Sequence, residues 1–422
     1  MKVKRRRFII GWFCVLLMVF IFSSCSSGDG VTDGDDSGIT QQTLFVYMPW
    51  TGSTSDNGLY SFFQQNLDSM EQGIKNAGGL SNKRVLVFLS TSATQSQLYE
   101  IVYNQGQIIH QTIKDYTGHT YTSASGITEI LNDVKATAPA LNYAMIIGCH
   151  GTGWTYKDDW TNYPYETGTA GTAAMLSAFK ISNLAKTRFF GSVTDLKNYA
   201  TDIPTLAQGI SDAGFKFQFI LFDDCYMANV ETAFALRNVT NFLVASTSEV
   251  MALGMPYKEM WNNLSSSAPT YTSLVDAFYD FYKNYEYPFG ALSAIDCRKM
   301  DGLAALMKKI NANYSLPESY RDSVQILGGY VPTIYYDFLD YVKYLKDANN
   351  NSLPASLLKS CQDTLQSLIR QTDHTDTLYT ALGLRAPYII IKNYCGIATS
   401  DPSINKVALK GKEKTDWWKA TH

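Results

Sequence analysis

The chain has 422 residues, of which 45% are hydrophobic and 17% are charged, and its formal net charge is −3. This composition predicts a globular protein with a large core and excludes an intrinsically disordered chain, which would hold fewer apolar residues and more charge. The sequence has neither a basic stripe nor a nucleic-acid-binding motif, so no nucleic acid is expected as a partner. Five histidines, with no pair at metal-ligand spacing, argue against a dedicated zinc site.

The first 25 residues have the pattern of a secretory signal peptide. Basic residues within the first seven positions are followed by the uncharged apolar run 8–22 and then by Ser23, Ser24 and Cys25. The run is shorter than the roughly 20 residues of a membrane-spanning helix, and an uncleaved signal anchor is the alternative. A cysteine after small residues resembles the lipobox of bacterial lipoproteins, with Phe22 where leucine is usual. The resemblance implies that Cys25 becomes the lipidated first residue of the mature chain.

Residues 26–42 are rich in Ser, Gly and Asp and poor in apolar residues, which predicts a flexible tether. We therefore expect a globular part, residues 43–422, held by lipid at a bacterial cell envelope, in the periplasm or facing outward. Once Cys14 has left with the signal and Cys25 carries lipid, five cysteines remain, so at least one thiol stays free unless two chains pair. A free cysteine is either a small buried hydrophobe or a nucleophile.

Predicted strands and helices alternate through residues 43–297. Apolar β-rich runs predict strands over 43–50, 84–90, 143–150, 217–223 and 242–246, with a further strand or hairpin over 100–113. Helical spacing of apolar residues predicts helices over 58–76, 126–136, 203–213 and 229–237. Near-continuous apolar strands alternating with helices predict an α/β domain around a mostly parallel sheet.

The pattern changes in residues 298–422. Helical periodicity covers 300–312, 335–347 and 353–372, and strand signals return over 388–392 and 394–399. We predict a mainly helical C-terminal subdomain that packs against the sheet and returns to it.

Two predicted strands end in chemically reactive side chains. One ends in Cys149, His150 and Gly151, and the other in Asp223, Asp224 and Cys225. Active groups of open α/β sheets lie at the carboxyl ends of strands, so His150 faces Cys225 if the two strands are neighbours. The imidazole is then able to take the thiol proton and return it to a leaving amine.

The backbone N–H groups of Gly151 and Cys225 are the predicted oxyanion donors, and the start of the helix predicted over 229–237 would favour a thiolate. On the residues alone, structural roles for the histidine and the cysteine stay open.

These sequence patterns resemble the clostripain family of cysteine peptidases. The catalytic histidine of that family stands in His-Gly followed closely by Gly-Trp, as at 150–154 here. Its cysteine stands in a pattern resembling Phe-Asp-x-Cys-x-Met-x-Asn-x-Glu, which runs over 222–231. Further agreement is found at 47–48, 56–57, 245–249, 254–257, 336–340 and 418–421. The resemblance implies a caspase-like three-layer fold and a cysteine endopeptidase with the dyad Cys225 and His150.

The resemblance also implies a specificity and an activation step. The acidic residue two positions before the nucleophile, here Asp223, selects Arg or Lys in the substrate, although a bond to loop amides is the alternative for this side chain. Many relatives are precursors cut between the histidine and the cysteine. The long connection 151–201 links two buried strands and contains five basic residues, which are Lys157, Lys180, Lys186, Arg188 and Lys197.

Some members of the family use calcium, but no EF-hand loop is present, so we expect no required cofactor and leave calcium open. Two other interpretations compete with a peptidase. One is a catalytically degenerate relative that binds peptides without cutting them. The other is a lipid-anchored adhesion or scaffold protein in which His150 and Cys225 are structural.

Overall fold

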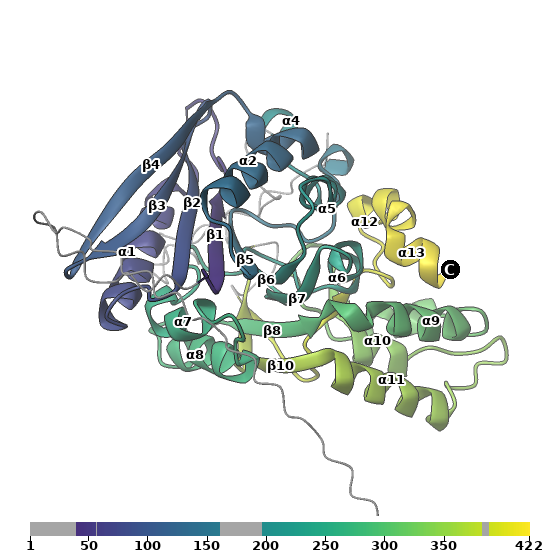
Figure 1. Ribbon diagram of the computed structural model, residues 1–422. Coiled ribbons are helices and arrows are strands. Elements are labelled where there is room, and N and C mark those ends of the chain that lie inside the picture. The colour runs from purple at the N-terminus through teal and green to yellow at the C-terminus, as the bar shows by residue number, and fades with distance from the viewer. Residues whose placement is uncertain (1–38, 56, 161–195, 382–387) are drawn as a thin grey trace, which may run out of the picture. The chain divides into compact units, whose positions relative to one another are not determined.

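The computed structural model describes residues 39–55, 57–160, 196–381 and 388–422. These residues are built around a nine-stranded sheet with the order β10-β8-β7-β6-β5-β1-β2-β3-β4 (Figure 1). Its strands are β1 (Gln42–Met48), β2 (Lys83–Ser92), β3 (Gln95–Asn104), β4 (Gln107–Thr117), β5 (Asn142–Gly148), β6 (Phe217–Asp223), β7 (Thr240–Ala245), β8 (Ala291–Asp296) and β10 (Ile369–His374). The central five, β2-β1-β5-β6-β7, pair in parallel, and β3 and β8 run against them. The sheet is therefore mostly parallel, as predicted.

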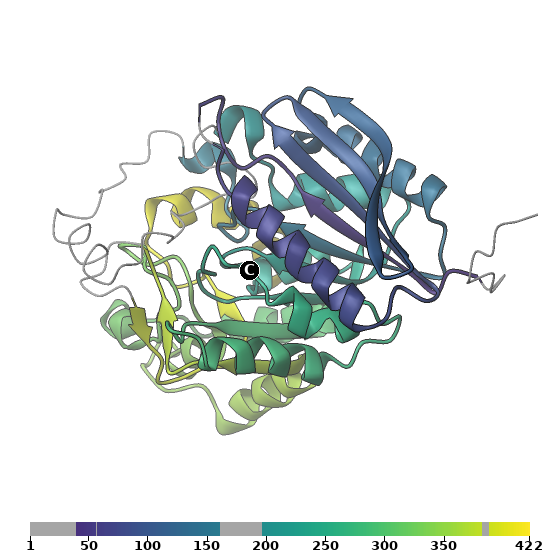
Figure 2. The same cartoon turned by 90° about the vertical axis from the view of Figure 1, so that its left-hand side faces the viewer.

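Helices cover both faces of the sheet. One face packs against α1 (Tyr60–Asn76), α7 (Tyr257–Leu264) and α8 (Tyr271–Lys283), and Figure 2 shows α1, in purple, in front of the strands. The other face packs against α2 (Ala124–Thr137), α5 (Ile203–Asp212), α6 (Val230–Leu236), α9 (Met300–Asn311), α10 (Phe338–Lys343), α11 (Ala355–Leu368) and α13 (Asp416–Thr421). All seven residues of β1 are buried because its side chains alternate between the two layers. This is the predicted three-layer α/β fold.

Shorter elements complete the described chain. Two small antiparallel sheets consist of β9 (Tyr336–Asp337) with β13 (Ala398–Thr399) and of β11 (Thr377–Tyr379) with β12 (Tyr388–Ile390). The remaining helices are α4 (Leu196–Tyr199), α12 (Lys406–Gly411) and the 3₁₀ turns η1 (Thr120–Thr122), η2 (Lys157–Trp160), η3 (Cys297–Lys299), η4 (Glu318–Ser323) and η5 (Lys412–Lys414).

The first half of the chain agrees closely with the sequence predictions. β6 has the predicted bounds, and the predicted strands on either side of it in the sheet differ from β5 and β7 by at most two residues at each end. The segment 100–113, predicted to be a strand or a hairpin, belongs to the hairpin β3–β4, which turns at Gln105 and Gly106, both with positive φ. The helices α7 and α8 were not predicted.

The part of the chain after residue 297 departs from the predictions in several places, and within the helix predicted over 335–347 the structure has the short strand β9 followed by α10. The helix predicted over 353–372 ends at Leu368, and the chain continues directly into β10. Helical periodicity did not reveal this change, because β10 gains its partners from the distant β8, with Ile369 opposite Ile295. β10 therefore returns the chain to the main sheet, whereas the predicted strand 394–399 contributes only β13, which pairs with β9.

The predicted division of the chain into 43–297 and 298–422 stays a prediction. The core on the α2 face includes buried side chains from both sides of that boundary, from Phe45 to Trp417. The predicted signal peptide, the lipidation residue Cys25 and most of the tether 26–42 lie outside the described residues. Within the described ranges, no helix has both the length and the hydropathy to cross a membrane.

Candidate active site

Strands β5 and β6 are parallel neighbours, which is the condition that the sequence left open. Their ladder ends with Gly148 opposite Asp223, so the chain beyond it brings Cys149 to the level of Asp224 and His150 to the level of Cys225. His150 is 5% exposed and Cys225 is 2% exposed. The two residues predicted to be the base and the nucleophile therefore follow adjacent strands at the same edge of the sheet.

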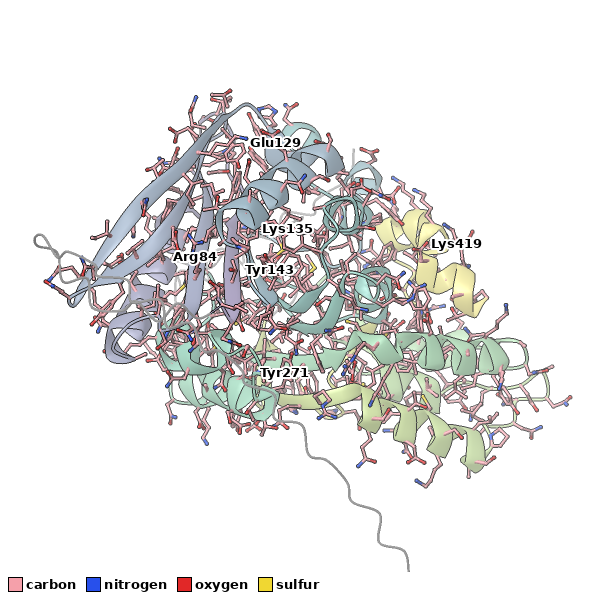
Figure 3. The ribbon with its side chains drawn as sticks, in the orientation of Figure 1. Arg84, Glu129, Lys135, Tyr143, Tyr271 and Lys419 are labelled. Atoms are coloured by element: carbon pink, nitrogen blue, oxygen red, sulfur yellow. The ribbon has the colours of Figure 1, made fainter. Side chains whose placement is uncertain are left out.

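The opposite ends of the two strands are held by aromatic packing. Tyr143, near the start of β5, packs edge-on against Phe215, just before β6, with ring centroids 4.8 Å apart. Lys135 of α2 lies over the same ring, 5.3 Å from its centroid, and Figure 3 labels Tyr143 and Lys135. These contacts add to the β-ladder in holding β5 against β6. The two loops that carry His150 and Cys225 start from the opposite ends of these strands.

Gly151 allows the two loops to approach closely. A Cβ atom on this residue would lie 2.5 Å from the carbonyl oxygen of Cys225, 2.9 Å from its nitrogen and 2.7 Å from Cβ of Asp224. Only glycine fits such an approach of one backbone to another. The predicted oxyanion donors, the N–H groups of Gly151 and Cys225, therefore belong to backbone segments in direct contact.

The loop after the histidine is fixed at a second glycine. Gly153 has φ +68°, and a Cβ atom there would overlap the hydroxyl of Tyr335. That hydroxyl donates to the carbonyl oxygen of Thr152, and its ring stacks on Tyr226, 5.0 Å between centroids. The loop that follows His150 thus packs against the loop around Cys225 at two positions, Gly151 and Gly153.

The sulfur of Cys225 contacts the segment that follows β7. The N–H of Val250 donates to Sγ at 3.2 Å, and the carbonyl oxygen of Val250 lies 3.7 Å from Sγ as the acceptor for a neutral thiol. An N–H donor on sulfur favours the negatively charged form. Tyr226, the next residue, has φ +65°, an unusual backbone conformation for a non-glycine residue, which costs on the order of 1–3 kcal/mol and requires support from its surroundings.

Glu249 provides part of that support. Its buried carboxylate accepts hydrogen bonds from the hydroxyl of Tyr226 at 2.7 Å, from the hydroxyl of Thr380 at 2.6 Å and from the N–H of Ala381 at 2.8 Å. Burial, reinforced by this carboxylate, raises the pKa of Tyr226 far above its ordinary value, so the phenol stays a donor. Glu249 stands in a sequence pattern shared with the family, but its role could not be predicted because these partners come from two distant segments.

Asp223 points to the α7 side of the sheet. Its Oδ2 accepts hydrogen bonds from the hydroxyl of Tyr257 at 2.7 Å, and the carboxylate also accepts the N–H of Met255. A Cβ atom on Gly254, which has φ +73°, would lie 2.6 Å from Oδ2. Burial raises the pKa of Asp223 to about 6, against the lowering effect of the Tyr257 and Met255 hydrogen bonds. Its buried Oδ1 has no hydrogen-bond partner among the described residues.

The last residues of the predicted cysteine pattern tie the site to the rest of the fold. Asn229 caps α6 by accepting the N–H of Thr232, and its amide donates to the carbonyl oxygen of Tyr226 at 2.6 Å. Glu231 accepts two hydrogen bonds from Ser400, and burial, followed by the charge of Asp401, raises its pKa to about 8. The influence of the α6 N-terminus on the thiolate stays a prediction.

The basic residues of the long connection fall partly outside the described residues, since Lys180, Lys186 and Arg188 lie in 161–195. Lys157 lies in η2, where its N–H donates to Asp202 at 2.8 Å and its ammonium to the carbonyl oxygen of Ala200 at 3.2 Å. Within 39–55, 57–160, 196–381 and 388–422, no group of three or more His, Cys, Asp or Glu side chains is arranged to hold a metal ion.

A three-layer α/β fold with a histidine and a cysteine after two neighbouring parallel strands defines the class of caspase-like cysteine peptidases. The comparisons with known proteins specify the family. The sequence model described as Peptidase_C11, clostripain family, matches residues 177–398. A search of curated proteins gave no match.

Solved structures of several proteases are similar to this chain. A secreted C11 cysteine protease from Bacteroides thetaiotaomicron, "iotapain", is 39% identical, with 91% of this chain and 100% of that chain covered and a TM-score of 0.79. A clostripain from B. thetaiotaomicron ATCC 29148, in complex with the peptide inhibitor BTN-VLTK-AOMK, is 40% identical over 56% of this chain and 99% of that chain, with a TM-score of 0.51. An inactive zymogen of a C11 protease from Parabacteroides distasonis is 21% identical over 91% of this chain and 99% of that chain, with a TM-score of 0.71, and shares the fold.

The chain belongs to the clostripain family and is a cysteine peptidase. The alternative of a catalytically degenerate peptide-binding relative is not favoured by these similarities.

Proposed function

We propose that this chain is an endopeptidase that hydrolyses peptide bonds after Arg or Lys, with Cys225 as the nucleophile and His150 as the general base. The observation that carries the specificity is the buried Oδ1 of Asp223, which has no hydrogen-bond partner among the described residues. A guanidinium or ammonium group of the substrate would supply that partner. The inhibitor bound to the similar clostripain from B. thetaiotaomicron ends its peptide in a lysine, VLTK, which supports the same preference here.

In the proposed reaction, His150 takes the proton of the Cys225 thiol, and the thiolate attacks the scissile carbonyl carbon. The N–H groups of Gly151 and Cys225 stabilise the oxyanion that forms. The imidazolium then protonates the leaving amine as the C–N bond breaks, which leaves an acyl-enzyme. Water attacks this thioester with His150 again as base, and the proton returns to the sulfur as the acid is released.

The same physics explains why a neutral residue would be rejected. Without a cation, Asp223 stays buried with one oxygen unsatisfied, whereas a bound Arg or Lys completes a charge-assisted contact. Removing one partner of a buried ion pair costs roughly 3 kcal/mol or more, which corresponds to over 100-fold in kcat/KM.

The test uses the chain from residue 26 and fluorogenic peptides that differ only in the residue before the cut, namely Arg, Lys, Leu and Gln. We expect cleavage after Arg and Lys that disappears in C225A and falls at least 100-fold in D223N, while D223N keeps its rate of alkylation at Cys225. Equal cleavage after Leu by the unmodified chain would refute the specificity. An inactive chain, also after limited trypsin treatment, would refute the dyad.

We also propose that the enzyme activates itself by one cut between His150 and Cys225. Lys157 is an unfavourable site because its backbone and ammonium are both hydrogen-bonded in η2. Lys180, Lys186, Arg188 and Lys197 are the remaining candidates. If C225A, incubated alone, is cut at the same bond as the unmodified chain, self-processing is refuted; if it is cut only by added active enzyme, cleavage between molecules is supported.

Two further expectations, on localisation and on cofactors, belong to the same proposal. The mature chain is exported and anchored at the bacterial envelope by lipid on Cys25, in line with the secreted relative from B. thetaiotaomicron. A C25A chain that stays in the membrane fraction would contradict the anchor. No cofactor is needed for the proposed chemistry, so activity is expected to survive treatment with EDTA. A requirement for added Ca²⁺ would show that calcium is a cofactor.

A further inference from the structure

A hydrogen bond connects the two catalytic strands just beyond the end of their ladder. The thiol of Cys149 donates to Oδ2 of Asp224 with 3.1 Å between sulfur and oxygen, and both side chains are at least 98% buried. Cys149 directly precedes His150, and Asp224 directly precedes Cys225. The contact therefore joins the two backbones at the residues next to the base and the nucleophile.

The surroundings of Asp224 restrict it from a second side. The position of a Cβ atom on Gly151 lies 2.7 Å from Cβ of Asp224, so this side chain is held between the Cys149 thiol and the Gly151 backbone. Cys149 itself packs in the core on the α2 face. Each side chain therefore belongs to one of the two catalytic loops and contacts the other.

We propose that Cys149 and Asp224 are a positioning pair that sets the separation of His150 and Cys225. The inference rests on the proposed Cys225–His150 dyad. A thiolate and an imidazolium stabilise each other only at short range, so a looser separation would weaken the ion pair that makes the thiol reactive at neutral pH. The hydrogen bond from the thiol to a buried carboxylate is charge-assisted, and its loss would leave a buried acceptor without that donor.

Other titratable groups near the pair come from several elements and must stay unchanged in the test. They are Tyr47 on β1, His150 after β5, Asp223 and Cys225 at the end of β6, and Tyr257 on α7. None of the substitutions below alters them.

The experiment compares C149A, C149S, D224A, D224N and the double variant C149A/D224A in the chain from residue 26. The first measurement is kcat/KM on an arginine peptide. The second is the pH dependence of alkylation of Cys225 by iodoacetamide, followed by peptide mass spectrometry, because this neutral reagent does not use Asp223. C361A, which removes a buried thiol from α11 in the same core, is the matched control for loss of a core sulfur.

We expect kcat/KM to fall about tenfold in C149A, as for loss of one hydrogen bond to a charged group, and the alkylation profile to move to higher pH. C149S keeps a donor and D224N keeps an acceptor, so each should lose less than the corresponding alanine variant. The double variant should be no worse than the poorer single variant, because both remove the same contact.

An unshifted alkylation profile in C149A and D224A, with only a loss of thermal stability like that of C361A, would overturn the proposal. Additive losses in the double variant would also overturn it. If D224A does not fold, the comparison of C149A with C149S still tests the proposal. A chain without peptidase activity would refute the proposed function, but the alkylation profiles would still show whether the pair tunes Cys225.

Discussion

The hydroxyl of Tyr257 is predicted to set the acid limit of the proposed cleavage after Arg and Lys. In that proposal Asp223 must be ionised to bind a substrate cation; burial raises its pKa to about 6, while the donors Tyr257 and Met255 act in the opposite direction. At pH 7 about nine-tenths of the carboxyl groups are then ionised in the free enzyme. Replacing Tyr257 by Phe removes one donor to Oδ2 and so raises this pKa further.

The size of the effect follows from one hydrogen bond. A neutral hydroxyl on a buried carboxylate contributes about 1.4 kcal/mol, a tenfold change in proton affinity, so the acid limb of kcat/KM should move about one pH unit upward. Near pH 6.5 the variant should be about threefold slower than the unmodified enzyme, and by about pH 8.5 the difference should vanish. The profile of kcat/KM is the right assay because it reports the free enzyme.

Tyr282→Phe is the matched control for this prediction. Tyr282 also has a buried hydroxyl near Asp223, but it donates to the carbonyl oxygen of Gly254 and not to the carboxylate of Asp223. The acid limb of kcat/KM for Tyr282→Phe should stay close to that of the unmodified enzyme. The pH profile of Cys225 alkylation should likewise stay unchanged in Tyr257→Phe. An unmoved acid limb in Tyr257→Phe, or an equal shift in Tyr282→Phe, would refute the reasoning.

Three other predictions concern the scaffold of the site. Gly151→Ala should lose about 100-fold in kcat/KM because its Cβ would overlap the Cys225 backbone, whereas Gly302→Ala, with open space around its Cβ, should lose nothing. Glu249→Ala should lower the free energy of unfolding by about 3 kcal/mol in urea titration, since three donors lose their acceptor, and Glu249→Gln should lose less. Fragments cut within 161–195 should elute together in gel filtration under native conditions, because β5 and β6 pair across the cut; separate elution would contradict this.

The sequence was sufficient to predict the sheet because its central strands carry their own signal. Runs such as 217–223 are apolar at nearly every position, as expected of strands covered on both faces. The order of strands was not predictable in this way. The strand order depends on where in the sheet each connecting helix places the next strand. The sequence therefore predicted that His150 and Cys225 lie together only if β5 and β6 are neighbours.

The surroundings of Cys225, the proposed nucleophile, could not be predicted for the same reason. Val250, Glu249 and Tyr335 reach Cys225 or Tyr226 from 23 or more positions along the chain, and no local pattern shows such contacts. The sequence placed Cys149 at the end of the strand predicted over 143–150. It is buried just after β5, and its hydrogen bond to Asp224 depends on the β5–β6 register, which could not be predicted from a single strand.

The consecutive carboxylates of Asp223 and Asp224 show why the register matters for function. Successive side chains of an extended chain point to opposite faces of a sheet. Asp223 accordingly meets Tyr257 and Gly254 on the α7 side, while Asp224 meets Cys149, which packs in the core on the α2 side. One dipeptide thus supplies a proposed substrate-binding carboxylate to one face and a proposed positioning carboxylate to the other, with the proposed nucleophile Cys225 immediately after them. A one-residue shift of β6 against β5 would exchange the two faces, so the ladder that ends at Gly148 and Asp223 decides which carboxylate can reach the substrate.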